Sequence, residues 1–219
     1  MTSPVRAPRS LVAAGALVFL LAVGLVLLMV VRPSSASPSG RSPSGSGASA
    51  PSEKSADVGF ARDMSIHHQQ AVEMAFVVRD RTDDEDVRRL AYDIINTQAN
   101  QRGMMLGWLE IWGRPKSSDR PPMEWMGHPA APGADGSLMP GMATDAEMDR
   151  LRAAGGRDAE VLFLRLMTVH HRAGAEMAQA AAGSAGTEEI RNLAAGMARA
   201  QESEITLMAD MLKARGAQP

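Results

Sequence analysis

The amino-acid sequence predicts an all-α protein whose folded part is a four-helix bundle made of two repeated helical hairpins. The first observation is an internal repeat, because residues 60–113 align without a gap with residues 163–216. The matched positions include Phe60 with Phe163, Met64 with Met167, His67-His68 with His170-His171, and Glu73-Met74-Ala75 with Glu176-Met177-Ala178. The second is the helical spacing of apolar residues in both repeats. Two amphipathic hairpins bury their apolar faces by packing together, which predicts a bundle with pseudo-two-fold symmetry.

An uncharged apolar run, residues 11–31, follows a short N-terminal segment, residues 1–10, that contains Arg6 and Arg9. The run is long enough to cross a bilayer as a helix and longer than the usual core of a signal peptide. We therefore predict a signal anchor, a single transmembrane helix, at residues 11–31, with a cleaved signal peptide as the alternative. The two arginines favour a cytoplasmic position for residues 1–10, so the folded part is expected outside the cytoplasm, membrane-anchored or secreted.

Residues 32–56 are rich in Ser, Pro, Gly and Ala. Such a segment buries too little apolar surface to offset its ordering entropy, so it predicts a disordered linker. The four-helix domain is predicted at residues 57–219. Its first repeat covers residues 58–113 and its second residues 157–216, and a Met-rich connection at residues 114–156 joins them. A connection of this length is typically functional or disordered.

Each repeat predicts two helices. They span residues 58–79 and 85–112 in the first repeat, and residues 158–182 and 188–214 in the second. On the second helix of the first repeat, steps of three and four predict one buried face. The residues of that face are Leu90, Ile94, Thr97, Gln101, Met104 and Trp108.

The ends of these helices carry recognisable capping residues. Residues 82–85 and 144–147 have the spacing of a capping box, and Thr187 is a suitable N-cap. The box at residues 144–147 predicts one short helix in the connection. Gly113 and Gly216 are predicted to end the second helix of each repeat, because glycine readily adopts the left-handed conformation that follows many helices.

Imidazole and thioether side chains share the predicted core face of the first helix in each repeat. The candidate metal ligands are Met64, His67, His68, Met74, Met167, His170, His171 and Met177. Small residues at Ala71 and Ala75 leave room for an ion or for a facing helix. The alternative interpretation is core packing, because duplication copies structural residues as faithfully as functional ones. If the first helices of the two repeats are neighbours, the symmetry brings both sets together.

The residue types favour copper over other metals. Thioether is a soft ligand that selects Cu(I), while imidazole suits several transition metals. The chain has no cysteine, which excludes a thiolate zinc site. It also lacks any Glu-x-x-His sequence, the signature of di-iron bundles. A copper ion, with silver as its mimic, is therefore the predicted ligand.

The connection supplies a second group of soft side chains outside the predicted helices. Candidate additional metal ligands there are Met123, Met126, His128, Met139 and Met142. Methionines in the second helices are ordinary core candidates: Met104, Met105, Met197, Met208 and Met211. Gln98 and Gln201, at equivalent positions, are expected to make polar contacts between helices.

The pattern Phe60-x-x-x-Met64-x-x-His67-His68, its second occurrence from Phe163, and the sequence Met139-Pro140-Gly141-Met142 resemble the domain of unknown function 305 family. The resemblance covers residues 57–216. It implies a ferritin-like fold and a secreted or membrane-anchored bacterial protein, and some members of the family are associated with copper binding and resistance. Two departures from repeat symmetry suggest unequal halves: Gln101 corresponds to Glu204, and Ala71 corresponds to Gly174.

Three functions remain open at this point. The first is a binding protein that buffers copper or passes it to a copper-trafficking protein partner. The second is a metal-free helical interaction or stress module of the envelope, and the third, less favoured, is a copper-dependent oxidoreductase. A net charge of −2 gives no support to a nucleic-acid binder. The sequence does not determine the oligomeric state.

Overall fold

The structure, a computed structural model, describes residues 49–218. Four long helices make up most of this part of the chain. This part contains five α-helices, one short 3-10 helix and no strand, so the all-α prediction is confirmed for it. The elements are α2 (Ala56–Arg79), α3 (Glu85–Ile111), η1 (Glu124–Met126), α4 (Asp145–Ala153), α5 (Gly156–Ser184) and α6 (Glu188–Ala214).

The predicted N-terminal segment 1–10, the membrane helix 11–31 and most of the linker 32–56 lie outside the described residues. Among residues 49–218, no helix is both long and apolar enough to cross a membrane.

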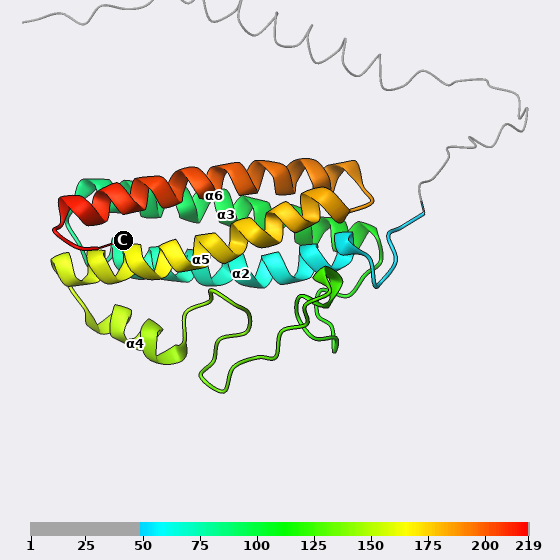
Figure 1. The fold of residues 1–219 in the computed structure, drawn as a ribbon, viewed down its shortest axis with the longest axis horizontal. Helices are drawn as coiled ribbons and strands as arrows, with labels where there is room; N and C mark the ends of the chain where they lie inside the picture. The colour runs from blue at the N-terminus through cyan, green and yellow to red at the C-terminus, as the bar shows by residue number, and fades with distance from the viewer. Residues whose placement is uncertain (1–48, 219) are drawn as a thin grey trace, which may run out of the picture. The chain divides into compact units, whose positions relative to one another are not determined.

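The long helices lie side by side, as Figure 1 shows. α2 pairs with α3 and α5 pairs with α6, so each repeat forms the predicted hairpin. α2 also packs directly against α5, and the two run in opposite directions (Figure 1). The first helices of the two repeats are therefore neighbours, which is the condition under which the sequence predicts that the two sets of candidate ligands come together.

The helix ends follow the predicted capping residues with one exception. Thr144 and Glu147 form a complete capping box at α4, and the Thr187 side chain caps α6. At α3 the predicted cap Thr82 is wrong, because Asp84 accepts the hydrogen bond from the Val87 amide at 2.9 Å. Thr82 is engaged elsewhere, since its hydroxyl donates to Glu160.

The predicted buried face of α3 is correct only in its first half. Leu90 and Ile94 are buried, but Thr97 and Met104 are exposed. Beyond Ile94 the buried residues are instead Gln98, Met105 and Leu109. The prediction continued from Ile94 to Thr97, a step of three residues that leads away from the core. The observed face continues from Ile94 to Gln98, a step of four. The other candidate core methionines are buried: Met105, Met197, Met208 and Met211.

Two apolar clusters fill the bundle, one toward each end. The Met74 cluster includes Ala71, Met74, Val78, Leu90, Ile94, Phe163, Met167, Met208 and Leu212. The Met64 cluster includes Val58, Phe60, Met64, Met105, Leu109, Met177, Ala181, Ile190 and Met197. On every long helix, polar residues separate the two clusters. This histidine layer consists of His67, His68, Gln98, Gln101, His170, His171, Gln201 and Glu204.

Two buried carboxylates tie the repeats to each other. Asp57 accepts hydrogen bonds from the Gly186 amide at 2.9 Å and from the Thr187 amide and hydroxyl at 2.8 and 2.7 Å. Glu160, its equivalent in the second repeat, accepts from Thr82 in the turn of the first hairpin. Burial alone would raise the pKa of Asp57, but these hydrogen bonds lower it below its usual value. Each first helix thus holds the turn of the opposite hairpin.

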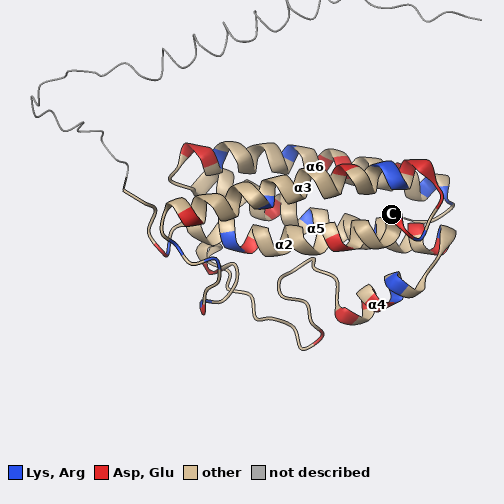
Figure 2. Ribbon diagram, turned by 180° about the vertical axis from the view of Figure 1, so that it is seen from behind, with Lys and Arg blue, Asp and Glu red and all other residues tan. Residues whose placement is uncertain are grey.

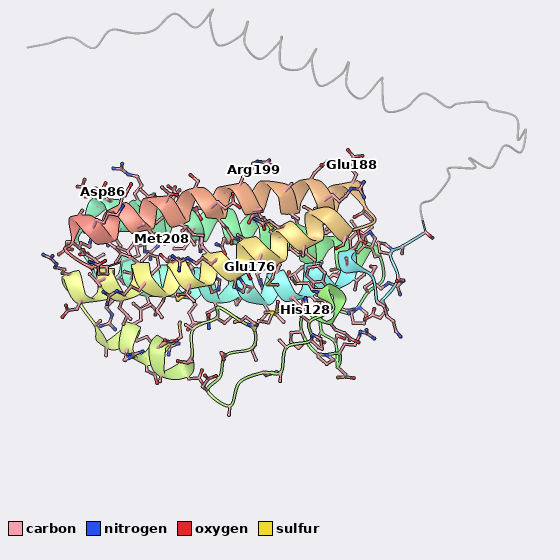
Figure 3. The ribbon with its side chains drawn as sticks, in the orientation of Figure 1. Asp86, His128, Glu176, Glu188, Arg199 and Met208 are labelled. Carbon is pink, nitrogen blue, oxygen red and sulfur yellow. The ribbon has the colours of Figure 1, made fainter. Side chains whose placement is uncertain are left out.

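We expect Asp57→Ala to lower the free energy of unfolding by about 2–4 kcal/mol, because two backbone amides would lose charged acceptors. Urea denaturation of the full chain measures the effect. Asp86→Ala is the matched control, since Asp86 is exposed on the first turn of α3 (Figure 3) and should change stability by about 0.5 kcal/mol or less. Equal effects of the two substitutions would show that Asp57 does not tie the hairpins.

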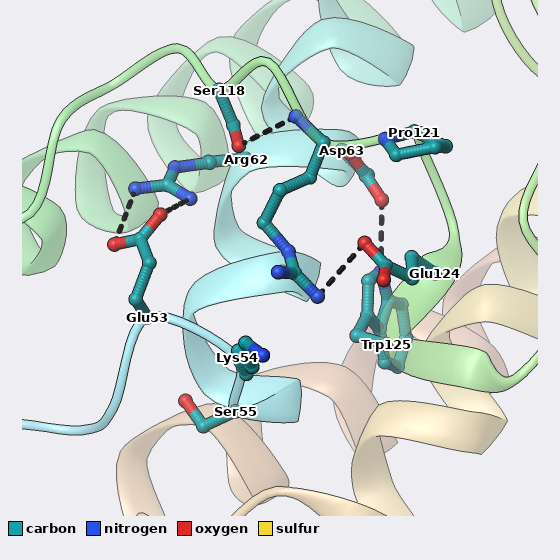
Figure 4. Close-up of a pocket in the computed structure, with 11 residues that line it drawn as sticks. Glu53, Lys54, Ser55, Arg62, Asp63, Ser118, Pro121, Glu124 and Trp125 are labelled. Atoms are coloured by element: carbon teal, nitrogen blue, oxygen red, sulfur yellow. Dashed lines mark hydrogen bonds and ion pairs between the residues drawn. The ribbon is translucent and has the colours of Figure 1, made fainter.

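The connection is fixed to α2 at two places. Asp63 accepts hydrogen bonds from the Met123 amide at 2.7 Å and from Trp125 Nε1 at 2.8 Å, as part of the small pocket drawn in Figure 4. Burial raises the pKa of Asp63, although these hydrogen bonds oppose the shift. Further along, Gln70 exchanges two hydrogen bonds with the backbone of Ala143. The connection is therefore an ordered part of this structure rather than a free loop.

Candidate metal centre

The four histidines of the two His-His pairs meet at the middle of the bundle. His67 and His170 stack with ring centroids 3.7 Å apart and ring planes inclined by 32°. All four side chains are at most 1% exposed. His67 and His170 occupy equivalent positions in the two repeats, so the pseudo-two-fold axis passes between them. Their contact confirms that the symmetry brings the histidine pairs together.

The outer histidine of each pair has one polar partner on the second helix of its own repeat. Nε2 of His68 lies 2.9 Å from Gln101 Oε1, and Nε2 of His171 lies 2.6 Å from Glu204 Oε2. Amide and carboxylate oxygens only accept hydrogen bonds, so each Nε2 carries the proton and donates it. The lone pair of each ring is therefore on Nδ1, which is buried and has no hydrogen-bond partner.

Several other polar atoms of the histidine layer are buried without a hydrogen-bond partner. They are both ring nitrogens of His67, Nε2 of His170, and the side-chain oxygens of Gln98 and Gln201. Buried polar atoms in native proteins nearly always have partners, and leaving one without a partner typically costs about 1–3 kcal/mol. These atoms are concentrated in one layer, and the imidazole nitrogens among them are donors of the kind that transition metals accept.

Three imidazoles of the layer, those of His67, His68 and His170, are held neutral by burial. Burial, reinforced by the neighbouring imidazoles, keeps the pKa of His67 and of His170 well below the usual range. Burial likewise lowers the pKa of His68 to about 3, against the opposing effect of its hydrogen bond with Gln101. A metal binds the neutral ring, so these side chains are in the protonation state that ligation requires.

The four candidate thioethers flank the layer rather than lying within it. Met64 and Met177 belong to the Met64 cluster, and Met74 and Met167 belong to the Met74 cluster. All four are fully buried. Each side of the histidine layer therefore carries one candidate thioether from each repeat. The structure brings the histidines together and distributes these methionines evenly on both sides.

The connection residues divide into two groups. Met139 is buried, and Met123, Met126 and Met142 are partly buried against the Met64 cluster. His128 is exposed in the connection, outside the four long helices (Figure 3). These methionines therefore extend the thioether-rich side of the bundle, whereas His128 does not join them in the core.

The described residues contain no preformed group of three or more His, Asp or Glu side chains arranged around one point for a metal ion. The stacked rings of His67 and His170 present faces to each other rather than nitrogens to a common point. Binding would therefore require rotation of these rings and help from thioether or amide ligands.

The sequence did not predict that Gln101 and Glu204 would be the hydrogen-bond partners of the histidines. Gln101 and Glu204 each follow their histidine by 33 residues, and the repetition of this separation is the signal that connects them. Gln98 and Gln201 are buried, but their side-chain oxygens have no hydrogen-bond partner and so do not make the predicted polar contacts between helices.

Gly174 is a point at which the two halves of the site differ. A methyl group there would lie 2.4 Å from Gln201 Oε1 and 3.1 Å from His67 Cε1. Glycine therefore leaves room at this point for both the Gln201 amide and the His67 ring, whereas alanine occupies the equivalent position 71 on the other side.

The solved structures that resemble this chain include three that differ in how close they are to it. A Streptomyces coelicolor protein of the DUF305 family, described as secreted, is 59% identical, with 76% of this chain and 98% of that chain covered and a TM-score of 0.71. A Deinococcus radiodurans DUF305 fragment is 31% identical, with 72% and 95% covered and a TM-score of 0.61. CopM in its Cu(II)-bound form is 25% identical, with 72% and 95% covered and a TM-score of 0.57. The comparison with curated proteins gave no match.

The family described as "Domain of unknown function (DUF305)" matches residues 57–212. This range contains all four long helices except the first residue of α2 and the last two of α6, together with both histidine pairs. The resemblance inferred from the His-His and Met pattern is confirmed, and the chain belongs to the DUF305 family.

Proposed function

We propose that this protein binds copper ions outside the cytoplasm and serves in copper buffering or resistance. The observation that carries the proposal is the histidine layer: buried imidazoles with ring nitrogens that have no partner lie between two thioether-containing clusters. Imidazole and thioether together suit copper in both oxidation states, with thioether favouring Cu(I).

The relatives support this choice of metal. CopM has been solved in a Cu(II)-bound form, the form that is 25% identical to this chain. The proposal for this chain rests on its own layer as well, because a fold alone does not specify what a protein binds.

The proposed ligands are drawn from His67, His68, His170 and His171, with Met64, Met74, Met167 and Met177 on either side. The histidines would supply nitrogen donors near the axis, and the thioethers would approach from both clusters. The connection residues Met123, Met126, His128, Met139 and Met142 are proposed as additional ligands on the Met64 side, where four of them already pack. Binding and storage require no catalysed step, and we propose no enzymatic activity.

The cellular setting is part of the same proposal. We place a ferritin-like four-helix domain outside the membrane, held by a signal anchor at residues 11–31 and a linker at residues 32–56. The Streptomyces coelicolor relative is described as secreted, which agrees with a domain outside the cytoplasm. Acidic and basic residues are interspersed along the long helices (Figure 2). We therefore propose that a copper-trafficking protein would recognise this domain through a local contact rather than through a large patch of one charge.

The test is a metal titration of the full chain in mild detergent. Cu(I), Cu(II) and Zn(II) are added separately, each in competition with a chromophoric chelator. We expect Cu(I) to bind more tightly than Zn(II). A variant with the five connection ligands replaced by alanine should bind fewer ions yet keep the tightest site. Binding no stronger than that of an ordinary helical protein would contradict the proposal and favour a metal-free interaction module.

A further inference from the structure

We infer that Glu204 is a positioning residue that makes His171 the stronger metal donor, so that the two halves of the histidine layer bind copper with unequal affinity. The inference rests on the proposed copper binding and adds that metal binds at His171 before it binds at His68. It starts from the one polar contact in the layer that differs chemically between the repeats.

The two outer histidines have the same geometry and different partners. His171 Nε2 donates to the Glu204 carboxylate at 2.6 Å, and His68 Nε2 donates to the Gln101 amide oxygen at 2.9 Å. In both rings Nδ1 is buried without a partner. The donor atom offered to a metal is therefore the same in both repeats, and only the group behind the ring changes.

A carboxylate behind a ligating imidazole fixes the tautomer and strengthens the ring as a donor. Loss of such a supporting group typically costs about 10–100-fold in metal affinity. A hydrogen bond to a charged acceptor is also about twice as strong as one between neutral groups. The neutral Gln101 amide orients His68 but supplies no charge. Metal bound through His171 is thus stabilised by an anion that His68 lacks.

The charge of Glu204 is available to His171. Within residues 49–218 Glu204 makes no ion pair with lysine or arginine, and His171 is its hydrogen-bond partner. The Glu204 side chain is 24% exposed, whereas that of His171 is fully buried. The Glu204 carboxylate therefore lies at the edge of the layer, close to solvent, and contacts the buried His171 ring. The neighbouring asymmetry at Gly174, which admits the Gln201 amide, adds to the difference between the halves.

The experiment exchanges the two partners. Full-length wild type, E204Q, Q101E and the exchanged double variant Q101E/E204Q are titrated with Cu(I) against a chelator at one fixed pH. The imidazole NMR signals of His68 and His171 are followed in parallel with Ag(I), which reports the ring that binds first. Thermal melting of each metal-free variant checks the fold.

We expect E204Q to weaken the first binding step about 10–100-fold, and Q101E to strengthen binding at His68. In wild type the His171 signals should respond first, and in the double variant the His68 signals should respond first with affinity restored. A merely structural role of Glu204 would not reverse that order. An E204Q affinity within about twofold of wild type, or an unchanged order in the double variant, would overturn the inference. If wild type itself binds no copper tightly, the proposed function fails instead.

Discussion

Replacing His67, His68, His170 and His171 together by leucine should lower the Cu(I) affinity of the full chain by about 1,000-fold or more, since every nitrogen donor of the layer is removed. The thioethers of the two clusters would remain, but they lie on opposite sides of the layer and approach it from different ends of the bundle. Competition with a chromophoric chelator measures the loss directly.

Leucine is chosen because it fills most of the volume that the imidazoles leave. The histidine layer buries several polar atoms without partners, so apolar replacement should leave the metal-free fold as stable as wild type or more stable. A matched control replaces the exposed Met104, which lies outside the core, by leucine and should change neither property. Retention of tight Cu(I) binding by the four-leucine variant would move the site to the connection methionines.

The metal-free protein should lose stability steeply as the pH falls from 7.5 to 5.5. In the unfolded chain histidine titrates near pH 6.5, whereas burial keeps the pKa of folded His67, His68 and His170 well below that value. Their contribution to stability is therefore complete above pH 6.5 and falls as the unfolded state takes up protons below it. Each histidine contributes about 1.4 kcal/mol across this interval, so the three together should cost about 4 kcal/mol.

Urea denaturation at a series of pH values, with chelator present, measures this dependence. The interval lies above the range in which most carboxylates titrate, so the histidines dominate it. The four-leucine variant is the control and should give a nearly flat profile. A flat profile in wild type would show that the buried rings accept protons in the folded state, and the layer would then be open to water.

Much of the fold followed from the sequence because helical periodicity and capping are local. The bounds of α6 agree with the predicted 188–214, and Gly113 and Gly216 adopt positive φ angles of 63° and 64°, as expected after a helix. The partial failure on α3, where Met104 is exposed and Met105 is buried, arose from one misjudged step along the helix. Thr82 failed as a cap because a residue of similar chemistry, Asp84, lies closer to the first turn.

The site was predicted less completely because its geometry depends on contacts between helices. The internal repeat indicated that the histidine pairs would meet if α2 and α5 were neighbours. The repeat did not show where along α2 and α5 the pseudo-two-fold axis lies. That position places His67 against His170 and puts Met64 and Met167 in different clusters. The partners Gln101 and Glu204 likewise depend on how α3 and α6 pack against the first helices.

X-ray absorption at the copper edge of the Cu(I)-loaded full chain tests the central claim most directly, because it identifies the atoms around the metal. Copper held by the histidine layer predicts nitrogen scatterers from imidazole together with sulfur scatterers from thioether, and the imidazole signal should be lost in the four-leucine variant. A spectrum of oxygen and nitrogen scatterers without sulfur, unchanged when the four histidines are replaced, would contradict the account.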